Sequence, residues 1–320
     1  MSKLFHIFTT FQSLDKQNLN RLEDLGNVHF IGNTNREEQL KSIASADAFL
    51  GPAQVNEEFF KAAPNLKVVS TSSVGYDRID VPTATKHKIA VCNTPVVLNG
   101  AVADLTLLLI LMLSRRILEN EAFSRSGSWA NREPLPELGH DITGKTLGII
   151  GFGRIGQEVA KRMMSLGMRI LWYDIFKEVA DGTPTYKYSD LTNLLKSSDF
   201  ISIHTNLNDQ SHHMIGEKEF SLMRESAYLI NTSRGPVIDQ KALFKVLQSN
   251  RIAGAGLDVL EQEPPQRDDP ITSLPNVITL PHMASATYET REAMRDLAVD
   301  NVISVLSGIK PKAIVNPEVL

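Results

Sequence analysis

The chain has 320 residues, a length that predicts two domains of ordinary size. Hydrophobic residues make up 42% of it and charged residues 22%, as in a typical globular protein, and the net charge of −4 gives no basic surface for nucleic acid. Cys92 is the only cysteine, so an intrachain disulfide and a cysteine-based metal site are excluded. Because Cys92 stands in an apolar run, we expect a buried structural thiol rather than a nucleophile.

Neither a targeting segment nor a membrane span is expected. The apolar run at residues 4–8 is too short for the core of a signal peptide. The longest apolar run, at 105–113, has about half the length that a membrane span requires. We therefore interpret this run as part of a buried helix between domains. We expect a cytoplasmic protein with no membrane partner. We also expect no metal site.

The first hundred residues alternate between short apolar runs and segments of helical pattern. Strands are predicted near 4–8, 28–31, 48–50, 66–70 and 89–92, and helices near 15–25, 36–45, 56–62 and 78–87. This alternation predicts a parallel sheet covered by helices on both faces.

A second series of strands and helices follows a long helix that is predicted over 102–126 and a loop that contains Pro134 and Pro136. Its strands are predicted near 146–150, 169–173, 199–203, 227–231, 252–258 and 276–280, and its helices near 154–166, 190–197, 217–223 and 239–249. Six strands are the number that a dinucleotide-binding sheet has. A final helix, at 288–306, lies beyond the sixth strand, and we expect it to return to the first domain.

A glycine-rich turn carries the strongest functional signal. Residues 151–156 read Gly-Phe-Gly-Arg-Ile-Gly, directly after a predicted strand and at the start of a predicted helix, and Asp174 closes the next strand 18 positions after Gly156. In that context Gly151 makes the tight turn, Gly153 lets the backbone approach a pyrophosphate, and Gly156 lets the helix pack on the strand. The pyrophosphate then faces the free N–H groups around Arg154 and Ile155. A glycine-rich turn that binds nothing is the disfavoured alternative.

Three further segments follow strands of the second series: 231–235, 256–264 and 281–285. The carboxyl ends of parallel strands lie at one edge of a sheet, where such folds bind ligands. We therefore expect Arg234, Asp258, Glu263 and His282 to meet in one crevice.

With these segments in this order, the chain resembles the D-isomer-specific 2-hydroxy acid dehydrogenases. The resemblance covers nearly the whole length and includes 72–77, 93–95 and 103–105, while 285–287 and 289–291 are most similar to the glyoxylate/hydroxypyruvate reductase branch. It implies two doubly wound α/β domains with parallel sheets. A Rossmann NAD-binding domain, 100–287, would be inserted into a smaller flavodoxin-like substrate domain, 1–99 and 288–320.

The resemblance also implies three catalytic residues. Arg234 offers a planar fork that can hold the carboxylate of a 2-oxo acid and polarise its ketone oxygen, although a surface salt bridge is the alternative for this residue. His282 is the expected proton donor to that oxygen. Glu263, directly before a proline, is the expected partner that favours the imidazolium form of His282, with Glu261 as its competitor.

Other residues are implied to bind cofactor or substrate. Asp258 is expected to hold the nicotinamide carboxamide, with a strand-end cap as the alternative. The backbone N–H groups of Val74 and Gly75 are expected to bind the substrate carboxylate, with a plain turn as the alternative. Further residues expected to line the cofactor pocket are Thr205, Asn206, Ser211, Thr232 and Ser233. Two positions depart from the family pattern: Ala284, where glycine is frequent, and Asn206, where proline is usual.

The sequence therefore predicts an enzyme that reduces a small 2-oxo acid, with glyoxylate or hydroxypyruvate as the first candidates. Pyruvate, 2-ketogluconate and an aryl pyruvate stay open as substrates. A non-catalytic NAD(H)-sensing interaction protein on the same fold is the alternative function. NADH is expected over NADPH because Asp174 would repel a 2′-phosphate, and a homodimer is expected through the cofactor domain.

Overall fold

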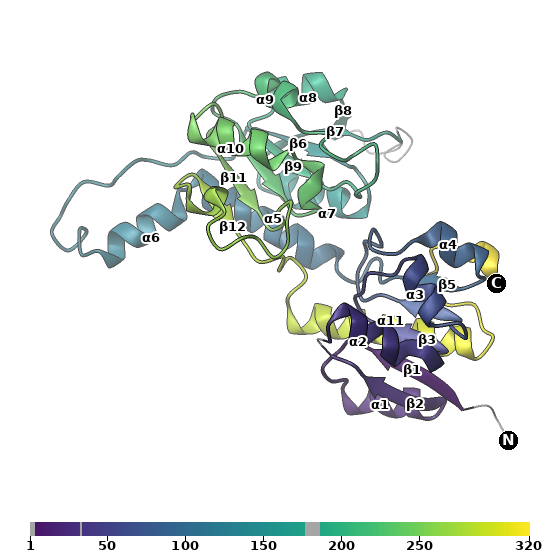
Figure 1. Ribbon diagram of the computed structural model, residues 1–320. Coiled ribbons are helices and arrows are strands. Elements are labelled where there is room, and N and C mark those ends of the chain that lie inside the picture. Colours follow the sequence, from purple (N-terminus) through teal and green to yellow (C-terminus); the bar gives the residue numbers. More distant parts are fainter. Residues whose placement is uncertain (1–3, 33, 177–185) are drawn as a thin grey trace. The chain divides into compact units, whose positions relative to one another are not determined.

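Two parallel sheets organise the chain, each in its own compact unit (Figure 1). The computed structural model describes residues 4–32, 34–176 and 186–320. The first unit comprises Met1–Leu98 and Ala286–Leu320, and the second comprises Asn99–Ser285. Within the described ranges no helix has both the length and the apolar character needed to cross a membrane.

The first unit contains a five-stranded sheet in the order β2-β1-β3-β4-β5, with every pair parallel. Its strands are β1 (Phe5–Thr9), β2 (Gly26–Phe30), β3 (Ala48–Leu50), β4 (Val68–Ser70) and β5 (Ala90–Cys92), and its helices are α1 (Lys16–Glu23), α2 (Arg36–Ser42), α3 (Glu57–Ala62), α4 (Val81–Lys86) and α11 (Tyr288–Leu306). This strand order is the flavodoxin-like one, so the predicted fold of this unit is confirmed.

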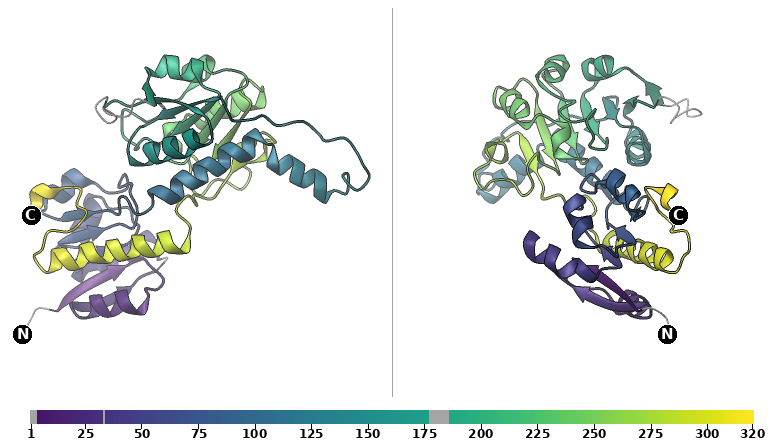
Figure 2. Two further views of the ribbon diagram at one scale, coloured as in Figure 1. Left: turned by 180° about the vertical axis from the view of Figure 1, so that it is seen from behind. Right: turned by 45° about the vertical axis from the view of Figure 1, so that its right-hand side comes forward.

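Both faces of this sheet are buried, which explains why its strands have continuous apolar runs. Ile7 packs with side chains of α1 and α11 on one face, while its neighbour Phe8 packs with side chains of α3 and α4 on the other. Helix α11, the last long helix of the chain, lies against β3 and β4 (Figure 2).

The C-terminal segment closes the edge of this sheet at β5. Ile314 forms an antiparallel bridge with Cys92, and the N–H of Val315 donates to the carbonyl of Val91 at 2.8 Å. The side chain of Asn316 accepts from the N–H of Val91 at 2.8 Å and donates to the carbonyl of Ile89 at 2.9 Å. Cys92 is buried beneath this segment, and burial raises the pKa of its thiol to about 12. The expectation of a buried cysteine is confirmed.

The second unit contains a seven-stranded parallel sheet in the order β12-β11-β10-β9-β6-β7-β8. Its strands are β6 (Thr146–Ile150), β7 (Arg169–Tyr173), β8 (Tyr186–Tyr188), β9 (Phe200–Ile203), β10 (Tyr228–Asn231), β11 (Gly254–Leu257) and β12 (Val277–Thr279), and its helices are α5 (Asn99–Ser114), α6 (Ile117–Arg125), α7 (Arg154–Ser165), α8 (Leu191–Ser197), α9 (Glu217–Leu222) and α10 (Gln240–Gln248). Six of these strands are those predicted, and the Rossmann order is confirmed.

The remaining strand of this sheet, β8, was not predicted. It has only three residues, and its sequence, Tyr-Lys-Tyr, is shorter than the run of four or more residues that marks a strand. Two aromatic contacts hold it at the edge of the sheet. The ring of Tyr186 packs on Phe152, and the ring of Tyr188 packs on Trp172.

The single long helix predicted over 102–126 is wrong, because the structure has two helices there. Helix α5 ends at Ser114, and Arg116 adopts the left-handed conformation with φ of 51° before α6 begins. A continuous helix would use the carbonyl of Ser114 within the helix. Here the N–H of His140, in the returning loop, donates to that carbonyl at 2.7 Å. The loop therefore ends α5.

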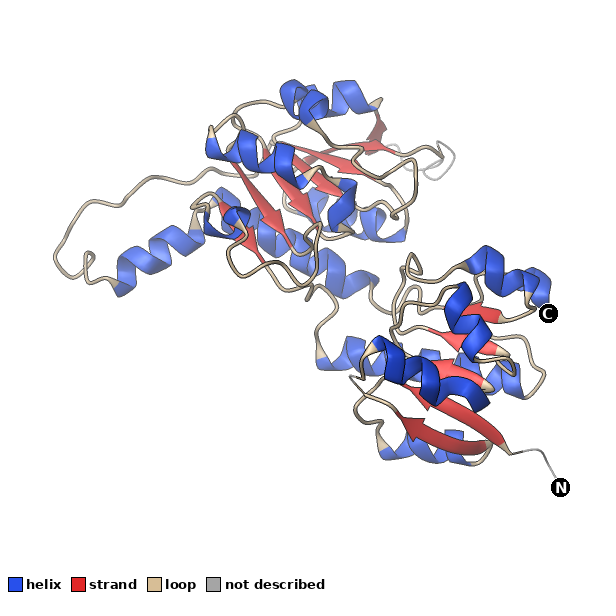
Figure 3. Cartoon of the chain, viewed as in Figure 1, coloured by secondary structure: helices blue, strands red, loops and turns tan. Residues whose placement is uncertain are grey.

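Helices cover both faces of the second sheet (Figure 3). Side chains of α8, α9 and α10 share one core cluster with strands β9, β10 and β11. Helices α5 and α7 pack together on the opposite face. A Cβ on Gly256 of β11 would lie 3.2 Å from the Cβ of Leu109, so the small residue lets α5 approach the sheet closely.

The register of the strands places their carboxyl ends at one edge. Asn231 pairs with Leu257, and Leu257 pairs with Thr279, so β10, β11 and β12 end side by side. The three segments that carry the expected catalytic residues leave the sheet at this edge.

Candidate active site

The glycine turn between β6 and α7 has two glycines that internal packing requires and one that it does not. Gly151 has φ of 89°, and a Cβ on it would lie 2.7 Å from the backbone of His204. A Cβ on Gly156 would lie 2.3 Å from the carbonyl oxygen of Gly151. A Cβ on Gly153 would meet nothing within 4 Å. No neighbouring atom of the described chain explains the glycine at 153, which fits the close approach of a ligand.

The turn has free hydrogen-bonding groups for a dinucleotide. Gly153 caps α7 without a side-chain bond, and within the described ranges the N–H groups of Arg154 and Ile155 have no partner. The hydroxyl of Thr205 is buried and also lacks a partner among these residues. A helix N-terminus with open N–H groups is suited to a pyrophosphate. The residues present therefore fit the pyrophosphate of a dinucleotide.

Asp174, directly after β7, lies over this turn. One carboxylate oxygen accepts the N–H of Phe152 at 2.7 Å, and the other accepts the N–H of Phe176 at 3.0 Å. These bonds fix the carboxylate beside the turn, where a ribose would bind in a fold of this type.

Ser211 and Thr232, both expected in the cofactor pocket, use their hydroxyls inside the protein. Ser211 donates to the carbonyl of Asn206 at 2.6 Å and so closes its own loop. Thr232 is buried, and its hydroxyl lies 2.9 Å from that of Thr106 on α5. Contacts of these two residues with a cofactor stay predictions.

Asn231, the last residue of β10, holds the loop that carries Arg234. Its side-chain oxygen accepts the N–H of Ser233 at 3.0 Å and the hydroxyl of Ser233 at 2.8 Å. Its amide group donates to the carbonyl of Arg234 at 2.9 Å. Sequence reasoning did not assign a role to Asn231, although a polar residue at the end of a buried strand is a recognisable signal.

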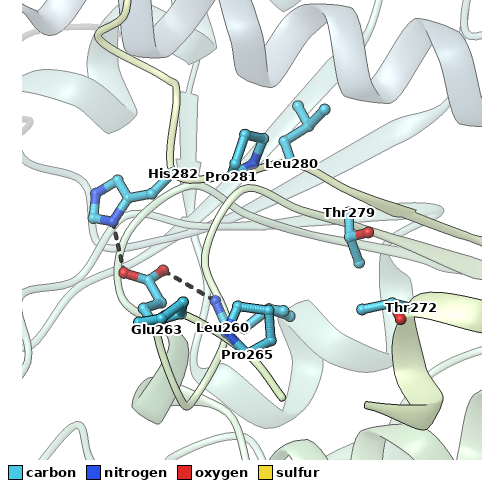
Figure 4. A pocket seen from close by; sticks show the side chains of 9 residues that line it. Leu260, Glu263, Pro265, Thr272, Thr279, Leu280, Pro281 and His282 are labelled. Carbon is cyan, nitrogen blue, oxygen red and sulfur yellow. Dashed lines mark hydrogen bonds and ion pairs between the residues drawn. The ribbon is translucent and has the colours of Figure 1, made fainter. Parts of the chain in front are cut away.

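His282 and Glu263 form a hydrogen-bonded pair (Figure 4). Nδ1 of His282 lies 2.8 Å from one carboxylate oxygen of Glu263, and the other oxygen accepts the N–H of Leu260 at 3.2 Å. Within the described ranges Nε2 of His282 has no partner. A cavity of about 470 Å³ lies beside the pair and is lined mainly by proline and leucine side chains.

The pKa of Glu263 lies below its ordinary value. Burial acts to raise this pKa, but the hydrogen bond and charge of His282 outweigh it, together with the N–H of Leu260 and the positive charge of Arg234. Glu263 is therefore a carboxylate at neutral pH, and its oxygen accepts from the Nδ1–H of His282. That bond occupies Nδ1 and leaves Nε2 as the ring nitrogen available to a ligand.

Glu261, the competing partner, is held elsewhere. One of its oxygens lies 3.0 Å from Nε2 of His213, and the other accepts the N–H of Gln240 at 3.1 Å. His204, near the glycine turn, is no alternative proton donor, because burial lowers the pKa of its imidazole to about 3. The carboxylate in contact with His282 is that of Glu263.

Asp258 directs both carboxylate oxygens to the backbone of the loop after β12. They accept the N–H groups of Met283 at 2.7 Å and Ala284 at 2.9 Å. These are the bonds of a strand-end cap, the alternative considered for this residue. Contact with a nicotinamide carboxamide stays a prediction.

The loop of Val74 and Gly75 belongs to the first unit. Within the described ranges the N–H groups of both residues have no partner, which suits an anion-binding turn. The side chain of Asn93 donates to the carbonyl of Val74 at 2.8 Å, and the side chain of Asn301 on α11 donates to the carbonyl of Asn93 at 3.1 Å. Two buried asparagines thus hold this loop, and neither was predicted to do so.

Comparison with known proteins places this chain among oxidoreductases. Residues 107–284 match the model of the D-isomer specific 2-hydroxyacid dehydrogenase, NAD binding domain. A glyoxylate reductase of Thermofilum pendens is 47% identical over 290 residues, which cover 89% of this chain and 86% of that protein.

Two solved structures are similar over nearly the whole length. An acyclic imino acid reductase in complex with NADPH and D-Arg has a TM-score of 0.88 and 32% identity, covering 97% of this chain and 100% of that chain. A D-lactate dehydrogenase of Aquifex aeolicus, complexed with NAD and lactic acid, has a TM-score of 0.87 and 30% identity, covering 97% of this chain and 98% of that chain.

The glycine turn generates a prediction about two alanine variants. Gly153→Ala should fold as the wild type does but bind NADH about tenfold or more weakly, because its methyl group projects where the pyrophosphate would bind. Gly156→Ala should instead lose about 1–3 kcal/mol of stability, because its methyl group overlaps the carbonyl of Gly151. Fluorescence titration with NADH and thermal unfolding measure the two effects. Wild-type NADH affinity in Gly153→Ala would contradict the assignment of the turn.

Proposed function

The chain belongs to the D-isomer-specific 2-hydroxyacid dehydrogenase family, and we propose that it reduces glyoxylate or hydroxypyruvate to the D-2-hydroxy acid with NADH. Membership makes it an oxidoreductase that acts on CH–OH groups and uses a nicotinamide cofactor. The choice of substrate is supported by the relatives named glyoxylate reductase. The observation that carries the catalytic assignment is the contact between His282 and Glu263.

His282 is the proposed acid and base. When bound, the reduced nicotinamide ring supplies a hydride for the carbonyl carbon. Nε2 of a protonated His282 donates a proton to the carbonyl oxygen, which completes the hydroxyl group. Glu263 holds Nδ1 and stabilises the positive charge of the imidazolium. In the oxidative direction the neutral imidazole takes the hydroxyl proton back.

Arg234 and the loop of Val74 and Gly75 are the proposed substrate-binding groups. The guanidinium of Arg234 is suited to bind the carboxylate of a 2-oxo acid and to polarise the adjacent ketone. Its positive charge contributes to the lowered pKa of Glu263, which supports a position near the proposed proton donor. The open N–H groups of Val74 and Gly75 offer further donors for a carboxylate.

The pH dependence of glyoxylate reduction tests this function. Glu263 accepts from Nδ1–H of His282 as a carboxylate, and its pKa is held below the ordinary value, so kcat/KM should fall only when acid protonates this carboxylate. Glu263→Gln removes the titrating group, so kcat/KM should be lower and this fall in acid should be absent from its profile. His282→Gln should lose on the order of 10²-fold or more in both directions.

Glu261→Gln is the matched control, because Glu261 has the same charge in the same loop but bonds to His213. Its pH profile should superimpose on that of the wild type. Superimposable profiles for Glu263→Gln would remove Glu263 from the mechanism. A panel of 2-oxo acids compared by kcat/KM then ranks glyoxylate and hydroxypyruvate against larger substrates.

Asp174 supports a preference for NADH. The carboxylate beside the glycine turn would accept hydrogen bonds from ribose hydroxyls and repel a 2′-phosphate. The ratio of kcat/KM for NADH to that for NADPH should therefore be well above one and should fall in Asp174→Asn, which keeps the shape but removes the charge. Equal kcat/KM values for the two cofactors in the wild type would contradict the proposal.

A homodimer is supported by exposed apolar side chains on an extended arm of the second unit, which we define as residues 117–138. The arm extends away from the seven-stranded sheet (Figures 1 and 2), and α6 has no buried residue. Its large exposed side chains include Trp129 at 71%, Leu135 at 58% and Leu138 at 78%. Apolar surface of this kind marks an interface, and a second copy of this chain is the proposed partner.

Charge on this arm should disrupt the dimer. Light scattering at micromolar concentration should give a dimer mass for the wild type and a smaller mass for the double variant Leu135→Asp, Leu138→Asp, because burying two carboxylates in an interface is unfavourable. Ile309→Asp is the control, since Ile309 is similarly exposed but lies in the first unit. A monomeric wild type would exclude this assembly.

A further inference from the structure

The carboxylate of Asp258 is almost fully enclosed, with 1% of the residue exposed. Asp258 directly follows β11, and its N–H donates to the carbonyl of Asn231 at 2.9 Å. Its backbone is therefore tied to the end of β10, at the edge where β10, β11 and β12 end side by side.

Three consecutive N–H groups of the next loop converge on this one residue. The N–H of His282 donates to the carbonyl of Asp258 at 2.8 Å. Those of Met283 and Ala284 donate to its two carboxylate oxygens at 2.7 and 2.9 Å. Successive backbone N–H groups that face one point form an anion-binding nest, and here the anion is a side chain of the protein itself.

The backbone conformation of His282 explains why these three hydrogen bonds are needed. Its φ is 52°, in the left-handed region that a residue with a Cβ adopts only at an energetic cost. The surrounding structure must supply bonds that offset this cost, and the three bonds to Asp258 begin at His282 itself.

We infer that Asp258 is a positioning residue, which holds His282 in the left-handed conformation and thereby sets the direction of its imidazole. This inference rests on the proposed role of His282 as the proton donor. The side chain of His282 is restrained through Nδ1 by Glu263, and its backbone is restrained through N–H by Asp258. Asp258 thus acts on catalysis through another residue.

The test uses Asp258→Asn in the full-length protein, with Asp239→Asn as the matched control. Asp239 also accepts a backbone N–H, that of Ala242 at 3.0 Å, but it caps α10 and not the loop of His282. The first measurement is hydrogen–deuterium exchange of the peptide that contains residues 282–284, without cofactor or substrate. Exchange there should rise about tenfold or more in Asp258→Asn, because an amide NH₂ group cannot accept a hydrogen bond, and should stay at the wild-type rate in Asp239→Asn.

The second measurement separates positioning from binding of the carboxamide. Turnover is compared with NADH and with reduced 3-acetylpyridine adenine dinucleotide, in which a methyl group replaces the carboxamide NH₂. A positioning residue predicts that Asp258→Asn lowers kcat by the same factor with both dinucleotides and leaves the Kd for NADH within about threefold. A loss confined to NADH, or an unchanged exchange rate, would overturn the inference.

Asp258→Glu keeps the test decisive if the asparagine variant does not fold. It retains the charge but displaces the carboxylate, so exchange at 282–284 should still rise. The exchange experiment needs no turnover, so a protein that does not reduce glyoxylate would contradict the proposed function while leaving this inference open to the same measurement.

Discussion

The parallel pairing of β10, β11 and β12 is the constraint on which the site depends. Backbone hydrogen bonds fix Asn231, Leu257 and Thr279 side by side, so the chain leaves each strand at the same edge. Residues that are far apart in sequence, such as Arg234 and His282, then start from neighbouring points. A slip of one residue in this register would turn every side chain of a strand to the other face, and the burial of both faces opposes such a slip.

Two buried polar side chains at this edge, which we call anchors, hold the loops of the site in place. Asn231 holds the loop of Arg234, while Asp258 holds the loop of His282. The two anchors are joined by the bond from the N–H of Asp258 to the carbonyl of Asn231. Each anchor is buried, where unsatisfied polar groups are costly, so their bonds have few alternatives.

The sequence was sufficient to predict the fold class and most of the strands. Apolar runs such as 146–150 are long and bounded by polar residues, and burial on both faces keeps them uninterrupted. The strand β8 escaped prediction because three residues carry no periodicity and its stability comes from the rings of Phe152 and Trp172. The end of α5 was missed for a similar reason, since it depends on a bond from His140, 26 positions further along the chain.

In the candidate site, too, the sequence predicted residues that belong to a local pattern and missed residues that act through contacts with distant segments. Glycines 151 and 156 could be named from their place between a strand and a helix. Arg234, Glu263 and His282 were named from the ends of strands together with the family resemblance. The resemblance favoured Glu263 over Glu261 because Glu263 stands directly before a proline. The contacts then separate the two carboxylates, since Glu263 bonds to His282 and Glu261 bonds to His213. The roles of Asn93 and Asn301 could not be predicted from the sequence, because the side chain of each donates a hydrogen bond to a segment that is distant in sequence.

The burial of Cys92 has a practical consequence for studying this molecule. The chain has no other cysteine, and this thiol is enclosed with a pKa of about 12, so almost none of it is present as the reactive thiolate at neutral pH. The natural sequence is therefore a ready background for site-specific labelling. A single cysteine introduced on the surface would take up a spin label or a fluorophore without prior removal of the native one.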